Sequence, residues 1–269
     1  MSGVVAPGGA RPARRLWAPG TGKRLTALAR AELTLLGRSK VPLFTAAVLP
    51  LAFMLTARST IKGEDLAEAG LSTGTVLVPS GLGFVLLFAV YSNLVPAYVV
   101  RREELVLKRL RCGELRDGEI LAGTALPSVV VALAQCLIIA VGGGLLLDVA
   151  APRAPHLVLA GLAGGTVMLV ALAAATAGVT RSAESAQLTI APLLMVSVLG
   201  SGLLIPLELL PDRVATVCEV LPLTPVIALI RTGWTGTAPQ TVTDLITMVA
   251  WTGLAVFAVR RWFRWEPRR

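Results

Sequence analysis

Long apolar runs alternate with short polar segments along this chain. The apolar runs cover residues 41–57, 76–100, 120–147, 157–179, 188–207 and 243–263. A helix needs about 17–25 mostly apolar residues to cross the hydrocarbon core of a bilayer, so the first run is at the lower limit and the others are comfortably long enough. The pattern predicts an all-α membrane protein with six transmembrane helices.

The polar segment between the second and third runs differs from the others. It reads RREELVLKRLRCGELRDGE, from Arg101 to Glu119, and carries six basic residues. Burying six such charges at mid-bilayer would cost on the order of 15 kcal/mol, so we expect the segment to lie in water. Its leucines make it too apolar for a simple connector. We therefore predict a short amphipathic helix from Leu105 to Arg111 along the membrane surface, as a docking site.

The N-terminal region has two predicted parts. Residues 1–22 are rich in Pro, Gly and Arg without an apolar stretch, which predicts a disordered cytoplasmic tail. Residues 23–40 have an apolar and a basic face, which predicts an interfacial helix that begins a single transmembrane domain of residues 23–269. Glu32 falls within the apolar face, so its carboxylate either pairs with an Arg or Lys or reaches water.

Prolines and glycines mark special positions in the predicted helices. Pro96 removes a backbone hydrogen bond near the end of the second span, which predicts a kink there, either as a structural bend or as a hinge. Gly161 and Gly165 allow a neighbouring helix to approach closely. Residues 208–240 are broken by several prolines yet remain apolar, which predicts a re-entrant or surface hairpin before the sixth span.

The basic residues are distributed unevenly between the two sides of the membrane. With six spans, 20 of the 25 basic residues fall on the side that carries both termini and the charged segment. The positive-inside rule places that side in the cytoplasm and the broken hairpin outside.

Composition excludes several classes of function. The chain is 55% hydrophobic and 15% charged, which is outside the range of soluble domains. Its net charge of +9 is not accompanied by the aromatic residues or motifs of a nucleic-acid-binding protein. No catalytic or metal-binding pattern is present, and the sequence from Gly20 to Arg24 lacks the Gly and Ser/Thr positions of a phosphate-binding loop.

The energy source for any transport is therefore expected on a partner. The interiors of the predicted spans carry no ionisable residue, whereas ion-coupled carriers usually need one. An ion-coupled secondary carrier and a non-transporting membrane scaffold stay open as alternatives.

Two groups of residues resemble the membrane subunits of type-2 ATP-binding-cassette (ABC) exporters. The first is Arg101-Arg102-Glu103-Glu104 with Leu107-Lys108-Arg109-Leu110-Arg111 and Gly118-Glu119-Ile120-Leu121-Ala122-Gly123, which is similar to the family's coupling region. The second is Gly202-Leu203-Leu204-Ile205-Pro206 followed by Leu221-Pro222-Leu223-Thr224-Pro225, which resembles its external hairpin. The order of predicted elements is that of this family as well.

The resemblance implies a permease subunit of a bacterial exporter in the inner membrane. It implies a second permease copy, identical or similar, and two ATP-binding subunits that hold ATP and magnesium, with no cofactor in this chain. A hydrophobic or amphipathic substrate is expected, such as a drug, an antibiotic or a lipid-linked molecule.

The resemblance also implies roles for individual residues. Those expected to contact the ATPase are Glu104, Leu105, Leu107, Lys108, Arg109, Leu110 and Arg111. Closure of the ATPase would tilt the second span about Pro96. Residues expected along the substrate path, for which ordinary helix packing is the alternative, are Phe84, Phe88, Tyr91, Asn93, Met195, Ser197 and Ser201.

Overall fold

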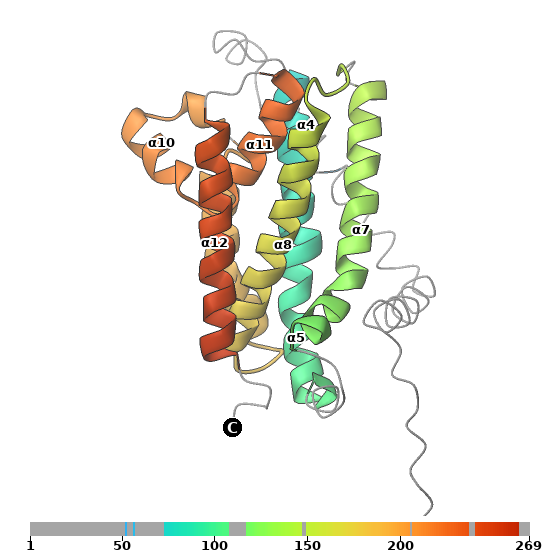
Figure 1. Ribbon diagram of the computed structural model, residues 1–269, viewed down its shortest axis with the longest axis vertical. Coiled ribbons are helices and arrows are strands. Elements are labelled where there is room, and N and C mark those ends of the chain that lie inside the picture. The colour runs from blue at the N-terminus through green and yellow to red at the C-terminus, as the bar shows by residue number, and fades with distance from the viewer. Residues whose placement is uncertain are drawn as a thin grey trace, which may run out of the picture.

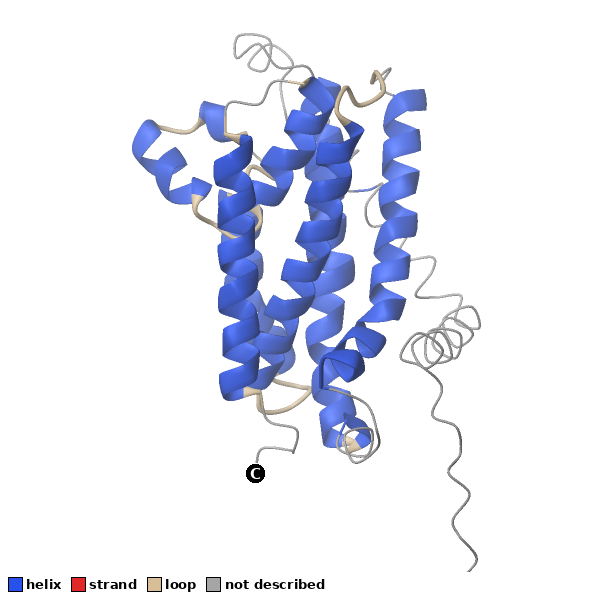
Figure 2. Cartoon of the chain, viewed as in Figure 1, coloured by secondary structure: helices blue, strands red, loops and turns tan. Residues whose placement is uncertain are grey.

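The computed structural model describes residues 52, 56, 73–107, 117–146, 149–204, 206–236 and 240–263. Helices and turns make up these residues, and no strand occurs among them (Figure 2). The elements in chain order are α4 (Thr73–Val85), the π-helix η1 (Leu86–Ser92), α5 (Asn93–Glu103), α7 (Asp117–Leu146), α8 (Pro155–Val179), α9 (Ala186–Gly200), the 3-10 helix η2 (Leu207–Leu209), α10 (Asp212–Glu219), α11 (Thr224–Thr235) and α12 (Thr241–Trp262) (Figure 1).

The N-terminal predictions lie largely outside the described residues. This applies to the tail of residues 1–22, the interfacial helix of residues 23–40 with Glu32, and most of the first span. Within that span, Ala52 and Thr56 are helical, and the Thr56 hydroxyl donates a hydrogen bond of 2.8 Å to the Ala52 carbonyl.

Four described helices are long and apolar enough to cross a membrane: Thr73–Glu103, α7, α8 and α12. They correspond to the second, third, fourth and sixth predicted spans. The number rises to five if α10 and α11, which meet at a bend of 99°, count as one span. The fifth predicted span is shorter than expected, because α9 ends at Gly200 rather than continuing to Leu207.

The central element of the bundle is the continuous helix formed by α4, η1 and α5. It spans 31 residues, and 83% of its most apolar window is buried, against 11% for α12. This helix packs against α7, α8 and α11. Its fully buried side chains include Leu82, Leu86, Tyr91, Leu94, Val95 and Tyr98. The exposed apolar surface therefore belongs to the outer helices, as expected for a bundle whose solvent is lipid.

The central helix continues through Pro96. Proline cannot donate a backbone hydrogen bond, so the Ser92 carbonyl loses the donor that a normal α-helix would supply. The π-helical stretch Leu86–Ser92 lies directly before this point, and the Asn93 side-chain amide donates a bond of 3.4 Å to the Ala89 carbonyl. Wide π turns are common where a helix is locally distorted. Pro96 thus does not end the helix, and its role as a hinge stays a prediction.

Two glycines of α8 bring it close to α11. A Cβ atom on Gly165 would lie 2.6 Å from Cγ1 of Val226, and one on Gly161 would lie 2.9 Å from Cγ1 of Ile230. Such distances are too short for carbon atoms, so the two helices require glycine at their contact. The expectation that these glycines serve helix packing is confirmed.

The segment after α9 is broken, as the prolines predict. Gly202 has a positive φ of 74°, and η2, α10 and α11 follow as short helices. The Thr224 hydroxyl donates to the Cys218 carbonyl at 2.6 Å, which fixes the bend between α10 and α11. The Trp251 indole donates to the Val220 carbonyl at 2.8 Å and ties this hairpin to α12.

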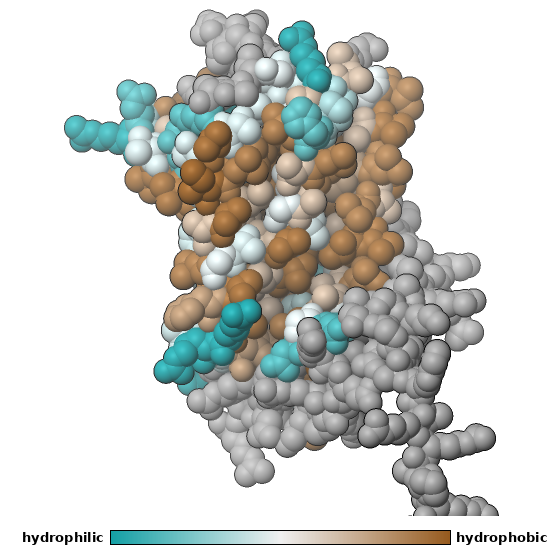
Figure 3. Space-filling view, viewed as in Figure 1, coloured by the Kyte–Doolittle hydropathy of each residue, from teal (hydrophilic) through white to brown (hydrophobic). Residues whose placement is uncertain are grey.

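Loops gather at two ends of the bundle. The end of α5, the α8–α9 turn and the end of α12 share one end, where Gly178 lies against Phe263 (Figure 1). The α7–α8 loop and the end of α11 share the other, where the Trp234 indole donates to the Ala150 carbonyl. Hydrophilic residues lie near both ends, with hydrophobic ones predominating between them (Figure 3). This grouping of loops is the one that the order of predicted spans requires.

The close contact between α8 and α11 gives a first prediction. We expect Gly165→Ala to lower the free energy of unfolding by about 1–3 kcal/mol, because the added methyl group meets the stiff side chain of Val226. The matched control is Gly253→Ala, since a Cβ atom there meets nothing within 4 Å. Thermal unfolding of both variants in one detergent measures the difference. Equal midpoints for the two variants would contradict the packing account.

Candidate functional site

The charged segment begins in the last turn of α5, and a turn at Glu104 and Leu105 follows. α5 continues to Glu103, and Glu104 caps it by donating its backbone N–H to the Val100 carbonyl at 2.9 Å. Leu105 has a positive φ of 59°, which is unusual for a residue with a side chain. Val106 and Leu107 are helical again. The prediction of a helix starting at Leu105 is therefore wrong in its first residue. The prediction rested on the absence of Gly and Pro from this stretch. A leucine with left-handed backbone angles cannot be recognised from the sequence in that way.

The predicted ATPase-contact residues fall partly within this turn. Glu104 and Leu105 are exposed, whereas the side chain of Leu107 is fully buried. Leu107 thus lies in the packed interior of this chain, and its contact with the ATPase stays a prediction. The other four residues, Lys108, Arg109, Leu110 and Arg111, lie outside the described residues.

Arg102 is the residue that the sequence analysis placed wrongly. We expected all basic residues of the segment to lie in water, but the side chain of Arg102 is fully buried. Its guanidinium donates hydrogen bonds to the carbonyls of Ala177 at 2.8 Å, Thr180 at 2.7 Å and Arg181 at 3.3 Å. All three acceptors lie at the C-terminal end of α8 or in the turn that follows it.

The chemistry of a helix terminus explains why this charge can be buried. The last four carbonyls of a helix have no partner within the helix, and the helix dipole makes this end negative. A guanidinium satisfies several such carbonyls at once with charge-assisted hydrogen bonds. Arg102 therefore caps α8 from the neighbouring helix, and its burial does not contradict the cost of an isolated charge.

Glu103 extends the same contact to the turn between α8 and α9. Its carboxylate Oε1 accepts a hydrogen bond of 3.1 Å from the backbone N–H of Ala183. The turn itself is ordered by Ser182 and Ser185, whose hydroxyls accept hydrogen bonds from each other's backbone N–H. We call the contacts of Arg102 and Glu103 with residues 177–183 the α5–α8 junction.

The opposite side of α5 is tied to the start of α7. The Tyr98 hydroxyl donates to the Leu121 carbonyl at 2.9 Å, and Arg101 donates to the Thr124 hydroxyl at 3.4 Å. The end of α5 is therefore held between α7 on one side and the α8–α9 turn on the other. The last turn of α5 is therefore in contact with three other elements at this end of the bundle.

A signal for Arg102 was present in the sequence. Val95, Tyr98, Val99 and Arg102 follow the spacing of one helix face, and all four side chains are fully buried. Extending the buried face of the second span by one further turn places Arg102 inside the protein. The apolar run ends at Val100, so a search by hydrophobicity alone stops before this residue.

The residues predicted along a substrate path do not share one surface of this chain. Phe84 and Phe88 stack with ring centroids 4.3 Å apart. Tyr91 is fully buried, and its hydroxyl shares a hydrogen bond of 3.1 Å with that of Thr176. Of the remaining four, Asn93 and Met195 are exposed, and Ser197 and Ser201 are buried.

Ser197 and Ser201 are unusual among the buried residues. They lie four apart at the end of α9, and the Ser201 backbone N–H donates to the Ser197 carbonyl. Neither hydroxyl has a hydrogen-bond partner within the part of the chain that the structure describes. Buried hydroxyl groups normally have such partners, so this end of α9 keeps unused capacity for a polar group.

The described residues hold no arrangement for catalysis by a metal. No group of three or more His, Cys, Asp and Glu side chains comes together in the described ranges. The acidic residues of the long helices stand in end turns, with Asp117 and Glu119 in the first turn of α7, Asp244 in the first turn of α12 and Glu103 in the last turn of α5.

Comparison with known proteins agrees with this arrangement. The model of the family described as ABC-2 type transporter matches residues 23–233, which include the central helix, the charged segment and most of the broken hairpin. A comparison with curated proteins found no match. The matched region covers most of the chain, and the chain belongs to the ABC-2 type transporter family.

Proposed function

We propose that this chain is the permease subunit of an ATP-driven exporter. The family implies association with an ATP-binding subunit, and the charged segment after α5 is the surface that would receive it. Two permease copies would enclose a path for a hydrophobic or amphipathic substrate such as a drug, an antibiotic or a lipid-linked molecule. The permease would lie in the bacterial inner membrane with both of its termini in the cytoplasm. The ATP-binding partner would hold ATP and magnesium.

The α5–α8 junction is the observation that supports this proposal most directly. The charged segment begins in the last turn of α5, which is bonded to the end of α8, the α8–α9 turn and the start of α7. A movement of the segment would therefore shift these helices together. If the charged segment were joined to the bundle by a flexible linker, its movement would not be transmitted to these helices.

The distribution of charge supports an external source of energy. Within the described parts of the long helices, acidic residues occur only in the first turns of α7 and α12 and in the last turn of α5. A carrier driven by an ion gradient usually places an ionisable group inside the membrane. Work supplied by a partner at the bundle end needs no such group.

Arg102 gives the prediction that tests the junction. We expect Arg102→Gln to lower the free energy of unfolding by about 2–3 kcal/mol, because the buried carbonyls lose their charge-assisted donors. Transport per ATP hydrolysed should fall at least about fivefold, the lower end of typical coupling effects. ATPase co-purification should persist. Transport into vesicles and phosphate release, both measured below the melting temperature, give this ratio.

The control for Arg102 is Arg181→Gln. The Arg181 side chain is exposed, whereas its backbone carbonyl accepts from Arg102 and remains in the variant. This substitution removes a positive charge from the same turn without removing the junction, so the transport ratio should not change. An unchanged ratio in a folded Arg102→Gln protein would contradict the proposed role.

Arg109 tests the contact with the ATPase separately. We expect Arg109→Glu to leave the protein in the membrane but to weaken ATPase co-purification by roughly tenfold or more, because it reverses a charge predicted to face acidic groups. The matched charge reversal is Arg213→Glu on α10, which is exposed at the other end of the bundle. Normal transport by Arg109→Glu would end the docking proposal.

A further inference from the structure

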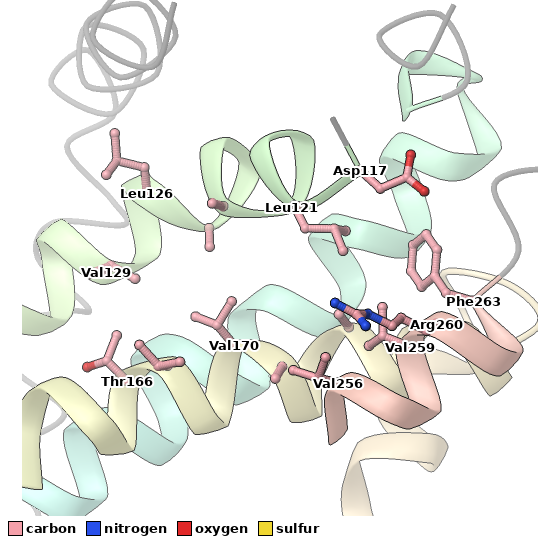
Figure 4. Close-up of a pocket in the computed structure, with 16 residues that line it drawn as sticks. Asp117, Leu121, Leu126, Val129, Thr166, Val170, Val256, Val259, Arg260 and Phe263 are labelled. Atoms are coloured by element: carbon pink, nitrogen blue, oxygen red, sulfur yellow. The ribbon is translucent and has the colours of Figure 1, made fainter. Parts of the chain in front are cut away.

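A cavity of about 840 Å³ lies between α7, α8 and α12, at the bundle end that carries the charged segment (Figure 4). It is separate from the α5–α8 junction. Its walls come from the first four turns of α7, the middle and last turns of α8 and the end of α12. The lining residues are Asp117, Gly118, Leu121, Ala122, Ala125, Leu126, Val129, Thr166, Val167, Val170, Ala171, Ala174, Val256, Val259, Arg260 and Phe263.

Small side chains create this hollow. Ala125, Ala171 and Ala174 stand where α7 and α8 face each other, and none of them is long enough to fill the space. The cavity opens outwards, because Val167 of its wall is 59% exposed and Val256 is 38% exposed. In a membrane, the medium beyond this opening is lipid.

The cavity is apolar along its length and polar at one end. Among the described residues of its wall, Thr166 alone carries a hydroxyl group, and that hydroxyl donates to the Leu162 carbonyl of its own helix at 2.7 Å. Arg260 and Asp117 lie together with Phe263 at the end near the charged segment (Figure 4). Arg260 is exposed and stands in the last turn of α12, at the expected depth of lipid headgroups.

The length of the cavity indicates what it can hold. From Asp117 to Val129 the wall of α7 rises about 18 Å at 1.5 Å per residue, which is close to half of a ~30 Å hydrocarbon core. That length matches the acyl chains of one leaflet. It is too short for a transmembrane helix, which must cross both.

We propose that this cavity is a binding site for one phospholipid of the leaflet next to the charged segment. The acyl chains lie between α7 and α8, and the phosphate group pairs with Arg260. Guanidinium groups favour phosphate because they offer several donors in one plane. The proposed lipid site does not depend on the proposed energy coupling.

Binding to the purified full-length chain tests the headgroup contact. The probe is phosphatidylglycerol added to the protein in detergent, with the bound fraction read by native mass spectrometry. We expect Arg260→Gln to weaken binding about fivefold, the effect of one charge near a lipid surface. The neighbouring Arg261 is exposed but does not line the cavity, so Arg261→Gln should bind as the wild type does. Equal losses in both variants, or equal binding of diacylglycerol, would overturn the assignment.

Filling the cavity tests the place of the acyl chains. Ala171→Trp should lower the bound fraction at least fivefold, whereas Ala163→Trp should not, because Ala163 is exposed on α8 outside the cavity. A second measurement needs no variant. The protein is placed in phosphatidylglycerol vesicles that contain a phospholipid with a photoreactive group midway along its acyl chain. This lipid should label Leu126, Val129 and Val170 of α7 and α8 to a greater extent than Ile246 and Val249 of α12. Uniform labelling of the exposed helices would contradict the site.

Discussion

The bonds between Arg102 and the end of α8 are the interaction on which the rest of the arrangement depends. A guanidinium without exposure to water is stable there because three backbone carbonyls surround it. Those carbonyls would otherwise be left without donors at a buried helix end. The guanidinium and the carbonyls thus offset each other's cost of burial. These bonds join α5 and α8, which are far apart in the sequence, at one end of the bundle.

This interaction joins the central helix to its neighbours at one end of the bundle. α4, η1 and α5 form the most buried element, and the last turn of α5 contacts α7, the end of α8 and the start of α9. The π-helical stretch and Pro96 lie one to four turns before that contact, where the helix has fewer regular hydrogen bonds. A helix that is firmly held at its end and irregular just before it is suited to tilting as a whole. The lipid-facing cavity lies beside this unit, along α7, α8 and α12.

Much of the fold could be predicted from hydrophobicity, because long apolar helices leave a strong periodic and compositional signal. The expected spans 120–147, 157–179 and 243–263 agree with α7, α8 and α12 to within about three residues. The end of α9 was missed because the residues after Gly200 stay apolar, and only the positive φ of Gly202 reveals the break. The site was harder to predict. Arg102 was assigned to water by its charge, whereas its position on the buried helix face decides its environment.

The most direct test of this account is whether the α5–α8 junction moves as one rigid unit during the ATP cycle. Glu104 and Glu184 are exposed and lie on the two sides of the junction, so spin labels at these positions report the distance between the sides. The distance is measured by electron paramagnetic resonance in the complete transporter, with one permease copy labelled. The account predicts that this distance stays constant between the nucleotide-free and ATP-bound states, while the distance from Glu104 to Thr216 at the opposite end changes. A separation of Glu104 from Glu184 on ATP binding would contradict it.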